Sequence, residues 1–329
     1  MLRKLGVLFM IVTAGLTACN GAAPAPTAVP DSTVRLKVVA TYSVLADLVR
    51  NVAGNQIELR TLVGPGADTH TFEPNPADGV AMSEAALLFE NGLGFEVWLD
   101  DLYLSSDSSA KRVVVSEGVE PREAPEGGHH DEEEQESTET PHAEDAQAGH
   151  EHGEFDPHLW HSVTNAIQMV KNIRQALANA DPTNAALYQS NADAYIVELQ
   201  ALDAWVFEQV KSVPEGHRKL VTTHDTFGYF AARYGFEILG TILPTSTEGA
   251  SLSAQELAAL VEAVRAAGVP AVFAENVSSN ALLKQVATEA GVNVVAALYT
   301  DALGEPGSEG DTYLKMMRFN VTTIVGALK

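Results

Sequence analysis

Histidine and aspartate residues recur in four short segments whose neighbours would hold them in place. His70 lies in GPGADTHTFEPNP, a loop with two glycines and three prolines that follows an apolar run ending at Val63. His158 lies in DPHLWH, just before a helical pattern, whereas His224 and Asp301 each follow an apolar run. Imidazole nitrogens and a carboxylate oxygen are the usual ligands of tetrahedral zinc in proteins. These four residues are therefore candidate metal ligands.

Each candidate also has a purely structural interpretation when it is taken alone. His70 could be an exposed turn residue, His158 a core histidine beside apolar neighbours, and Asp301 a turn former or helix cap. The positions carry more weight together. Ligands of open α/β sheets bind beyond the carboxyl ends of the strands. Because His70, His224 and Asp301 all follow predicted strands, we expect them to meet at a crevice between two domains.

Two series of short apolar runs alternate with helical patterns, which predicts an α/β fold with mainly parallel sheets. The predicted strands of the two series are 36–40, 57–63, 86–90 and 112–115, then 219–223, 236–242, 271–274 and 293–296. The predicted helices are 44–52, 75–84 and 95–102, then 227–234, 253–267, 280–290 and 313–328. We interpret the two series as two domains.

Residues 163–210 separate the two series and carry helical patterns with almost no strand signal. Asp181-Pro182 is typical of a helix start, so it divides this region into two helices. The second helix, of about 27 residues, would span roughly 40 Å at 1.5 Å per residue, enough to pass from one domain into the other. The expected parts are an N-terminal lobe at 34–182, a linking helix at 183–212 and a C-terminal lobe at 213–329.

The N-terminal residues are typical of an export signal. Residues 1–18 combine a basic start with an apolar run that is too short to span a bilayer, and they end in LTA before Cys19. Cys19 is the only cysteine, and LTAC resembles the bacterial lipobox, whose cysteine is acylated. Residues 19–33 are rich in Ala and Pro, and we expect them to be a flexible tether between the lipidated Cys19 and the folded protein. The protein would then be anchored at the outer face of the cell membrane, or lie in the periplasm. The alternative is an ordinary secretory signal that is cleaved near Ala18.

The negative charge of the chain is concentrated in one segment. The formal net charge is -24, and residues 120–154 contain 13 acidic residues against one basic residue, Arg122. Such a charge argues against nucleic-acid binding. We expect a mobile loop at 117–157 that binds metal weakly, because it has almost no apolar side chains. A solvated acidic linker is the alternative. The histidines of this loop are His129, His130, His142, His150 and His152.

Several motifs together resemble the zinc and manganese substrate-binding proteins of ABC importers, the cluster 9 (A-I) family. The motifs are GPGADTHTFEPNPAD, DPHLW, THDTFGYFAARYG, FAEN, LYTDALG and TYLKMMRFNV. The resemblance runs from about Leu36 to the C-terminus and is interrupted by the acidic loop. It implies two (β/α)4-like lobes joined by a long rigid backbone helix. It also implies metal ligands at His70, His158, His224 and Asp301.

The resemblance further indicates which metal the chain binds. Relatives with a carboxylate at the position of His224 tend to be manganese proteins, and those with histidine tend to be zinc proteins. A His- and acid-rich insertion is also typical of zinc members. The resemblance therefore implies an extracytoplasmic, monomeric zinc-type member that captures Zn²⁺ between its lobes and delivers it to an ABC permease and its ATPase. Mn²⁺ is the alternative metal, and a metal-buffering lipoprotein without a transporter is an alternative role.

Three further residues are candidates to support the ligands. Asp225 and Glu275 could orient a ligating imidazole by accepting its second N–H. Many relatives continue DPHLW with a Leu-Asp-Pro-like sequence, whereas this chain has His161-Ser162-Val163. His161 could support a ligand, compete with one, or begin the following helix, and we favour the last.

A zinc hydrolase is the rival from another class of protein. Three histidines with an open coordination position also describe catalytic zinc. The sequence has no His-Glu-x-x-His motif, however, and a fourth ligand at Asp301 would close the site. We therefore expect a binding protein and not an enzyme.

Overall fold

The computed structural model describes residues 35–124, 155–243 and 253–329. Several sequence predictions lie outside the described residues: the signal at 1–18, the tether at 19–33 with Cys19, and His129, His130, His142, His150 and His152. Among the helices of the described ranges, none is both long enough and apolar enough to cross a membrane.

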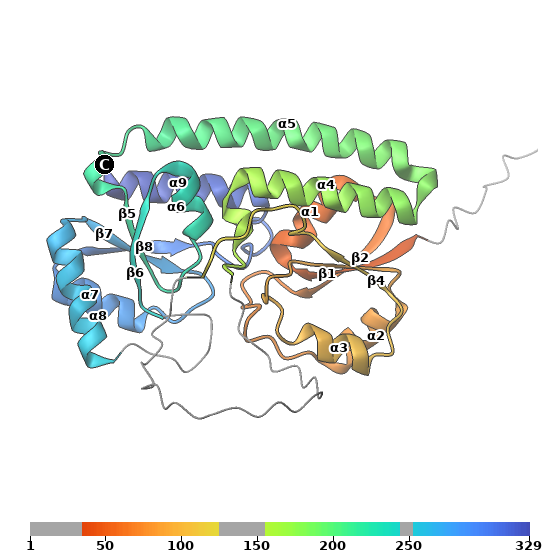
Figure 1. Cartoon of the computed structure of the whole chain (residues 1–329), viewed down its shortest axis with the longest axis horizontal. Helices are drawn as coiled ribbons and strands as arrows, with labels where there is room; N and C mark the ends of the chain where they lie inside the picture. Colours follow the sequence, from red (N-terminus) through yellow and green to blue (C-terminus); the bar gives the residue numbers. More distant parts are fainter. Residues whose placement is uncertain (1–34, 125–154, 244–252) are drawn as a thin grey trace, which may run out of the picture. The chain divides into compact units, whose positions relative to one another are not determined.

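The first lobe is built on a four-stranded parallel sheet with the order β2-β1-β3-β4 (Figure 1). Val38 in the central strand β1 pairs with Leu59 of β2 on one side and with Leu87 of β3 on the other. Every residue from Val38 to the end of β1 is buried, as expected of a strand covered on both faces. The elements are β1 Leu36–Tyr42, α1 Ser43–Ala53, β2 Ile57–Val63, α2 Pro76–Glu84, β3 Leu87–Glu90, α3 Leu99–Ser105 and β4 Lys111–Val114.

The loop between β3 and α3 is organised around one buried carboxylate. Glu96 accepts hydrogen bonds from Thr41 Oγ1 (2.6 Å) and from the backbone N–H of Asn91 (2.7 Å), and burial raises its pKa to about 7. This loop includes residues that were expected to be helical, so α3 begins only at Leu99. The predicted start of the helix at residue 95 was therefore wrong. The Asn91 side chain in turn donates to the carbonyl of Pro157 (2.9 Å). The loop therefore helps to position the segment that carries His158.

The second lobe contains two separate parallel strand pairs, β5-β6 and β7-β8, among the described residues. Both ladders have a register irregularity, between Leu220 and Val221 in one pair and between Phe273 and Glu275 in the other. The strands predicted as one set of four are therefore present, but they pair two by two. The elements are β5 Lys219–Thr222, α6 Gly228–Tyr234, β6 Glu237–Thr241, α7 Ala254–Ala267, β7 Ala271–Glu275, α8 Ala281–Ala290, β8 Asn293–Leu298 and α9 Tyr313–Leu328.

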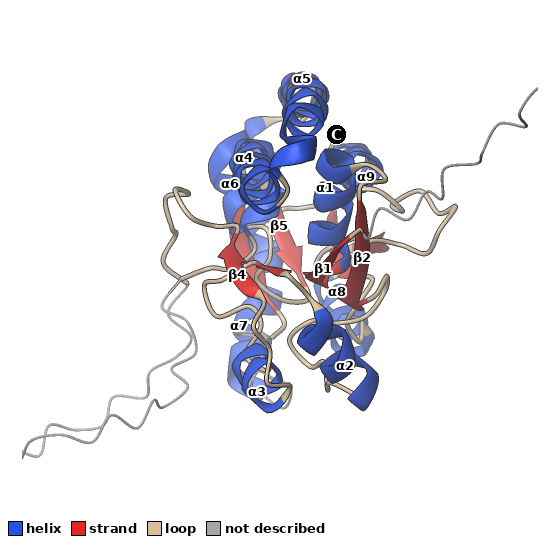
Figure 2. Ribbon diagram, turned by 90° about the vertical axis from the view of Figure 1, so that its right-hand side faces the viewer, coloured by secondary structure: helices blue, strands red, loops and turns tan. Residues whose placement is uncertain are grey.

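Two long helices connect the strand series. A 3₁₀ helix at Leu159–His161 leads into α4, Val163–Ala180, and after a tight turn α5 runs over Ala185–Val210. Asp181 caps this turn by accepting hydrogen bonds from the backbone N–H of Asn184 (3.4 Å) and from Tyr188 Oη (2.7 Å). α5 packs against α4 and α1 and, further along, against α9. It therefore spans both lobes, and Figure 2 shows α4 and α5 on one side of the strands, with α2 and α3 on the other.

Polar contacts near the strand ends join the two lobes. The backbone N–H of Gly66, in the loop of His70, donates to the carbonyl of Leu303 (2.9 Å). The N–H of Leu303 donates to Ser43 Oγ (2.9 Å), and that of Tyr313 donates to the buried carboxylate of Asp47 (2.9 Å). One apolar core continues from β1 through α5 to α9. The α/β fold with mainly parallel sheets, predicted from the sequence, is confirmed.

Candidate metal centre

Four side chains from distant parts of the chain converge at the strand ends: the metal-facing atoms of His70, His158, His224 and Asp301 lie within 4.8 Å of one another. His70 follows β2, His224 follows β5, Asp301 follows β8, and His158 immediately precedes the 3₁₀ helix. Their side chains are only 6%, 4%, 5% and 0% exposed, in the order His70, His158, His224, Asp301. The structure thus brings together all four residues that the sequence singled out, in a site nearly closed to solvent.

Four of the spacings between these side chains are close to the edges of a small coordination polyhedron. His70 Nε2 lies 3.3 Å from His158 Nε2, and His224 Nε2 lies 3.1 Å from Asp301 Oδ2. Asp301 lies 3.6 Å from Nε2 of both His70 and His158. A tetrahedron with metal–ligand bonds of 2.0–2.1 Å has edges of about 3.3 Å. Asp301 Oδ1 is buried and has no hydrogen-bond partner in the described part of the chain, which is costly unless a cation compensates it.

The loop of His70 is fixed by contacts on either side of the histidine. Asp68 Oδ1 accepts the backbone N–H of His70 (2.8 Å), the usual geometry of an Asp two residues ahead. Trp98 Nε1 donates to the carbonyl of Thr69 (2.8 Å), and the ring of Phe95 meets that of His70 edge-on at 4.8 Å. These contacts hold the imidazole toward the other three side chains.

His158 is oriented by a carboxylate that the sequence analysis missed. Asp156 Oδ1 accepts both the backbone N–H of His158 (2.9 Å) and its ring Nδ1–H (2.9 Å), which leaves Nε2 facing Asp301. The available signal was the Asp-x-His spacing, which also relates Asp68 to His70. Burial alone would lower the pKa of His158, but the carboxylates of Asp301 and Asp156 raise it above the usual histidine value.

His224 is oriented by Glu275, one of the two carboxylates proposed for this role. Glu275 Oε1 accepts the backbone N–H of His224 (2.8 Å), and Oε2 contacts its ring Nδ1. Burial lowers the pKa of His224, but Glu275 and Asp301 raise it well above the usual value. Asp225 does not take the expected position: within the described contacts its Oδ1 is buried without a hydrogen-bond partner, and burial raises the pKa of its carboxyl.

The other two members of the site differ in charge. Burial lowers the pKa of His70 to about 3, which the attraction of Asp301 does not offset, so this imidazole is neutral. Burial would raise the pKa of Asp301, but His224 and His158 hold it below its usual range. Below pH 6.5 and without a metal, the site therefore holds one anionic carboxylate, one neutral imidazole and two protonated imidazoles.

His161 lies outside the converging set. Its buried ring packs against Phe227 (4.6 Å between centroids) and Trp160 (5.7 Å), and within the described part of the chain neither ring nitrogen has a hydrogen-bond partner. Burial lowers its pKa to about 3. His161 is the last residue of the 3₁₀ helix and directly precedes Ser162, the N-cap of α4. This position agrees with the favoured prediction that His161 lies at the start of the following helix.

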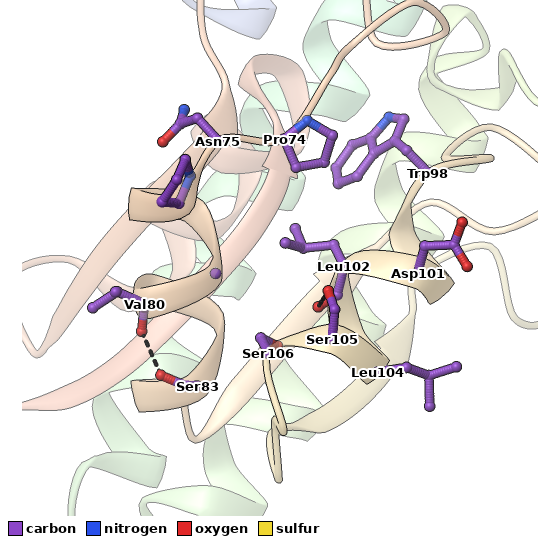
Figure 3. A pocket seen from close by; sticks show the side chains of 12 residues that line it. Pro74, Asn75, Val80, Ser83, Trp98, Asp101, Leu102, Leu104, Ser105 and Ser106 are labelled. Atoms are coloured by element: carbon purple, nitrogen blue, oxygen red, sulfur yellow. Dashed lines mark hydrogen bonds between the residues drawn. The ribbon is translucent and has the colours of Figure 1, made fainter.

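A separate groove of about 1140 Å³ lies between α2 and α3 (Figure 3), and its lining residues do not include any of the four converging side chains. Its lining is largely apolar and includes Trp98, Leu102 and Leu104. The groove shares one residue with the support of the metal site, because Trp98 also donates to Thr69 next to His70. It lacks the metal-binding side chains, so it is not the candidate metal centre.

A family model described as the zinc-uptake complex component A, periplasmic, matches residues 38–327. The chain belongs to this family. It is a metal ABC transporter substrate-binding protein, and members of the family are binding proteins and not enzymes. The membership of the family of metal-binding ABC importer proteins, predicted from the motifs, is thereby confirmed, and the hydrolase alternative is wrong. The assignment to the zinc-type members stays a prediction.

The relatives carry different metals in their names. The chain is 32% identical to the manganese-binding lipoprotein MntA of Halalkalibacterium halodurans, over 99% of both chains. Among solved structures, it is similar to a manganese-bound mutant of the periplasmic metal-binding protein of Candidatus Liberibacter asiaticus (TM-score 0.77, 27% identity, 90% of this chain and 100% of that one). It is also similar to the periplasmic zinc-binding protein TroA of Treponema pallidum (TM-score 0.74, 29% identity, 89% and 99%).

Proposed function

We propose that the chain binds Zn²⁺ through His70, His158, His224 and Asp301 and delivers it to an ABC permease and its ATPase. The carrying observation is the ligand set itself, three imidazole nitrogens and one carboxylate oxygen at spacings near the edges of a zinc tetrahedron. Zinc accepts imidazole readily, whereas manganese favours sites richer in oxygen. His224 therefore favours zinc, since it supplies nitrogen where a carboxylate would supply oxygen.

Mn²⁺ is the second candidate, and two observations favour it. The relative from Halalkalibacterium halodurans is named for manganese. In addition, Asp301 Oδ1 is buried and accepts no hydrogen bond from residues 35–124, 155–243 and 253–329, so Asp301 could offer both oxygens and raise the coordination number above four.

A competition experiment with both metals tests the proposal. The mature chain is titrated with Zn²⁺ and Mn²⁺ against a chromophoric chelator, and we expect zinc to bind at least about 100-fold more tightly, as the order of divalent-metal affinities predicts. Equal or tighter manganese binding would overturn zinc as the cargo, and the absence of tight binding by either ion would overturn the metal centre.

Two variants assign the tight site to the proposed ligands. His224→Ala should abolish tight binding. Deletion of residues 125–154, which hold most of the acidic and histidine-rich sequence, should remove only weaker additional ions. If the deletion removed the tight ion instead, the four converging side chains would not be its site.

The location of the protein is a further part of the proposal. We infer that Cys19 is acylated and anchors an extracytoplasmic monomer, in line with the lipoprotein name of the relative from Halalkalibacterium halodurans. Cys19→Ser should move the protein from the membrane fraction to the soluble extracytoplasmic fraction. Unchanged membrane association would refute the anchor.

A further inference from the structure

The chain segments on either side of residues 125–154 pair with each other. Glu123 and Phe155 form an antiparallel bridge, and the backbone N–H of Asp156 donates to the carbonyl of Arg122 (2.8 Å). The backbone positions of Arg122 and Asp156 are therefore fixed relative to one another. Asp156 is the residue that orients His158, so this pairing reaches the metal centre.

The two oxygens of Asp156 have different surroundings. Oδ1 accepts both hydrogen bonds from His158. Oδ2 is buried, has no hydrogen-bond partner among the described residues and lies 3.9 Å from Nε of Arg122. Arg122 Nε is likewise buried, and no described residue forms a hydrogen bond with it. A buried carboxylate oxygen and a buried guanidinium nitrogen are each costly unless an opposite charge is close. Their proximity compensates both, and it holds Oδ2 on the side away from His158.

The start of α6, from the second lobe, completes this arrangement. Tyr229 Oη donates to the carbonyl of Asp156 (3.1 Å) and accepts the backbone N–H of Arg122 (3.0 Å). At Gly228, a Cβ atom would lie 2.5 Å from Asp156 Oδ2 and 3.2 Å from Arg122 Nε. The absence of a side chain at this position therefore allows the ion pair to lie against α6, which begins four residues after His224.

We propose that Arg122 and Gly228 are positioning residues for the metal centre, which act on the ligand His158 through Asp156. Arg122 attracts Oδ2, and Gly228 leaves the space for it, so that Oδ1 stays aligned with the ring of His158. Loss of either lets the carboxylate rotate and weakens the orientation of the imidazole. The inference rests on the proposed function of the metal centre.

A double-mutant cycle separates this role from general stability. Zinc affinity is measured at fixed pH and ionic strength for Arg122→Gln, Arg122→Lys, Asp156→Asn and the double variant Arg122→Gln/Asp156→Asn. We expect Arg122→Gln to weaken zinc binding roughly three- to tenfold, less than the 10–100-fold typical of a residue that contacts the ligand directly. Lys should restore most of the loss. In the Asp156→Asn background, Arg122→Gln should have no further effect.

Two other variants serve as control and independent test. Arg60→Gln breaks another arginine pair with a buried carboxylate, that of Arg60 Nη2 and Asp78 (3.1 Å), and should leave zinc affinity unchanged. Gly228→Ala should weaken zinc binding in the parent but not in the Asp156→Asn background. The backbone of Gly228 lies outside the left-handed region, and alanine favours the helical conformation. Backbone strain would therefore not explain a loss of zinc affinity in Gly228→Ala.

Co²⁺ absorption spectra of the same variants report the ligand geometry. We expect altered d–d bands in Arg122→Gln and Gly228→Ala and the parental spectrum in Arg60→Gln. Two results would overturn the inference: an additive loss of affinity in the double variant, or unchanged affinity in both Arg122→Gln and Gly228→Ala. In either case, tight zinc binding by the parent protein would still support the metal centre. A parent protein that fails to bind zinc overturns the proposed function instead.

Discussion

Glu275 holds His224 at two points, its backbone and its ring. Oε1 accepts the backbone N–H at 2.8 Å, and Oε2 contacts Nδ1. Because Nδ1 carries the proton shared with Glu275, Nε2 is the nitrogen that faces Asp301 at 3.1 Å. One carboxylate from β7 therefore determines both where the loop after β5 lies and which nitrogen is available to a metal.

Glu275→Gln should lower zinc affinity by about 10–100-fold, the range typical of a lost partner behind a metal ligand. Glutamine keeps an acceptor for the backbone N–H but loses the negative charge that polarises the imidazole. Chelator competition measures the change. Asp47→Asn is a suitable control, because it alters another buried carboxylate that accepts a backbone N–H, from Tyr313, and it should leave zinc affinity unchanged. Equal effects of the two substitutions would contradict a specific role for Glu275.

Zinc affinity should fall steeply as the pH is lowered. The slope of the logarithm of the association constant against pH should be set by two histidines and not three. The pKa values of His158 and His224 are raised above the ordinary value, so both are protonated below pH 6.5 and the metal must displace two protons. His70, with a pKa of about 3, is already neutral. The logarithm of the association constant should therefore rise by about two per pH unit between pH 5 and 6.5 and flatten as pH passes the raised pKa values.

Chelator competition at several pH values, combined with calorimetry in buffers of different ionisation enthalpy, counts the protons released. A slope near three would mean that His70 is also protonated in the free protein. No dependence on pH would contradict the imidazole ligand set.

Trp98→Phe should speed the release of bound metal. The substitution keeps an aromatic ring against Phe72 but removes the 2.8 Å hydrogen bond to the carbonyl of Thr69, which precedes His70. A lost hydrogen bond of about 1 kcal/mol corresponds to a roughly fivefold faster dissociation. Stopped-flow transfer to a chelator measures the rate. Trp205→Phe alters a tryptophan that packs beneath Arg318 and should release metal at the parental rate.

His224→Glu should shift metal preference toward manganese. The substitution exchanges a nitrogen ligand for oxygen, so zinc affinity should fall more than manganese affinity, with the ratio changing at least about tenfold. Competition between the two ions measures the ratio. His217→Gln, at a histidine whose ring contacts the carbonyl of Leu328, should leave it unchanged. An unaltered ratio in His224→Glu would show that this position does not decide between the metals.

Much of the fold was predictable because apolar runs and helical patterns are local signals. All the strands lie within two residues of their predicted bounds. The separation of β5-β6 from β7-β8 was not predictable, since strand pairing depends on contacts between distant residues, and the register irregularities within each pair leave no clear mark in the sequence. The helix expected at 95–102 begins late because Glu96, with apolar neighbours, binds backbone N–H groups of its own loop.

The candidate site was predictable where chemistry coincided with strand ends, as for His70, His224 and Asp301. The supporting carboxylates were harder to assign. Asp225 is adjacent to His224 in sequence, yet Glu275 from β7, 51 residues away, reaches the ring. Sequence proximity cannot show which of two carboxylates a fold brings to an imidazole. Asp156, in contrast, was accessible through the local Asp-x-His geometry that it shares with Asp68 and His70.

The carboxylates of Asp156 and Glu275 also make the site prefer ions of one particular charge. With Asp301 they bring three negative charges to the imidazoles. The guanidinium of Arg122, beside Asp156, compensates one of these charges, and below pH 6.5 the protons on His158 and His224 compensate the other two. A divalent cation that replaces both protons leaves the total charge of this buried cluster unchanged. A monovalent or trivalent ion would leave one charge uncompensated, at a cost of several kcal/mol. The electrostatics therefore select two-plus ions as a class, before the identity of the ligand atoms discriminates among them.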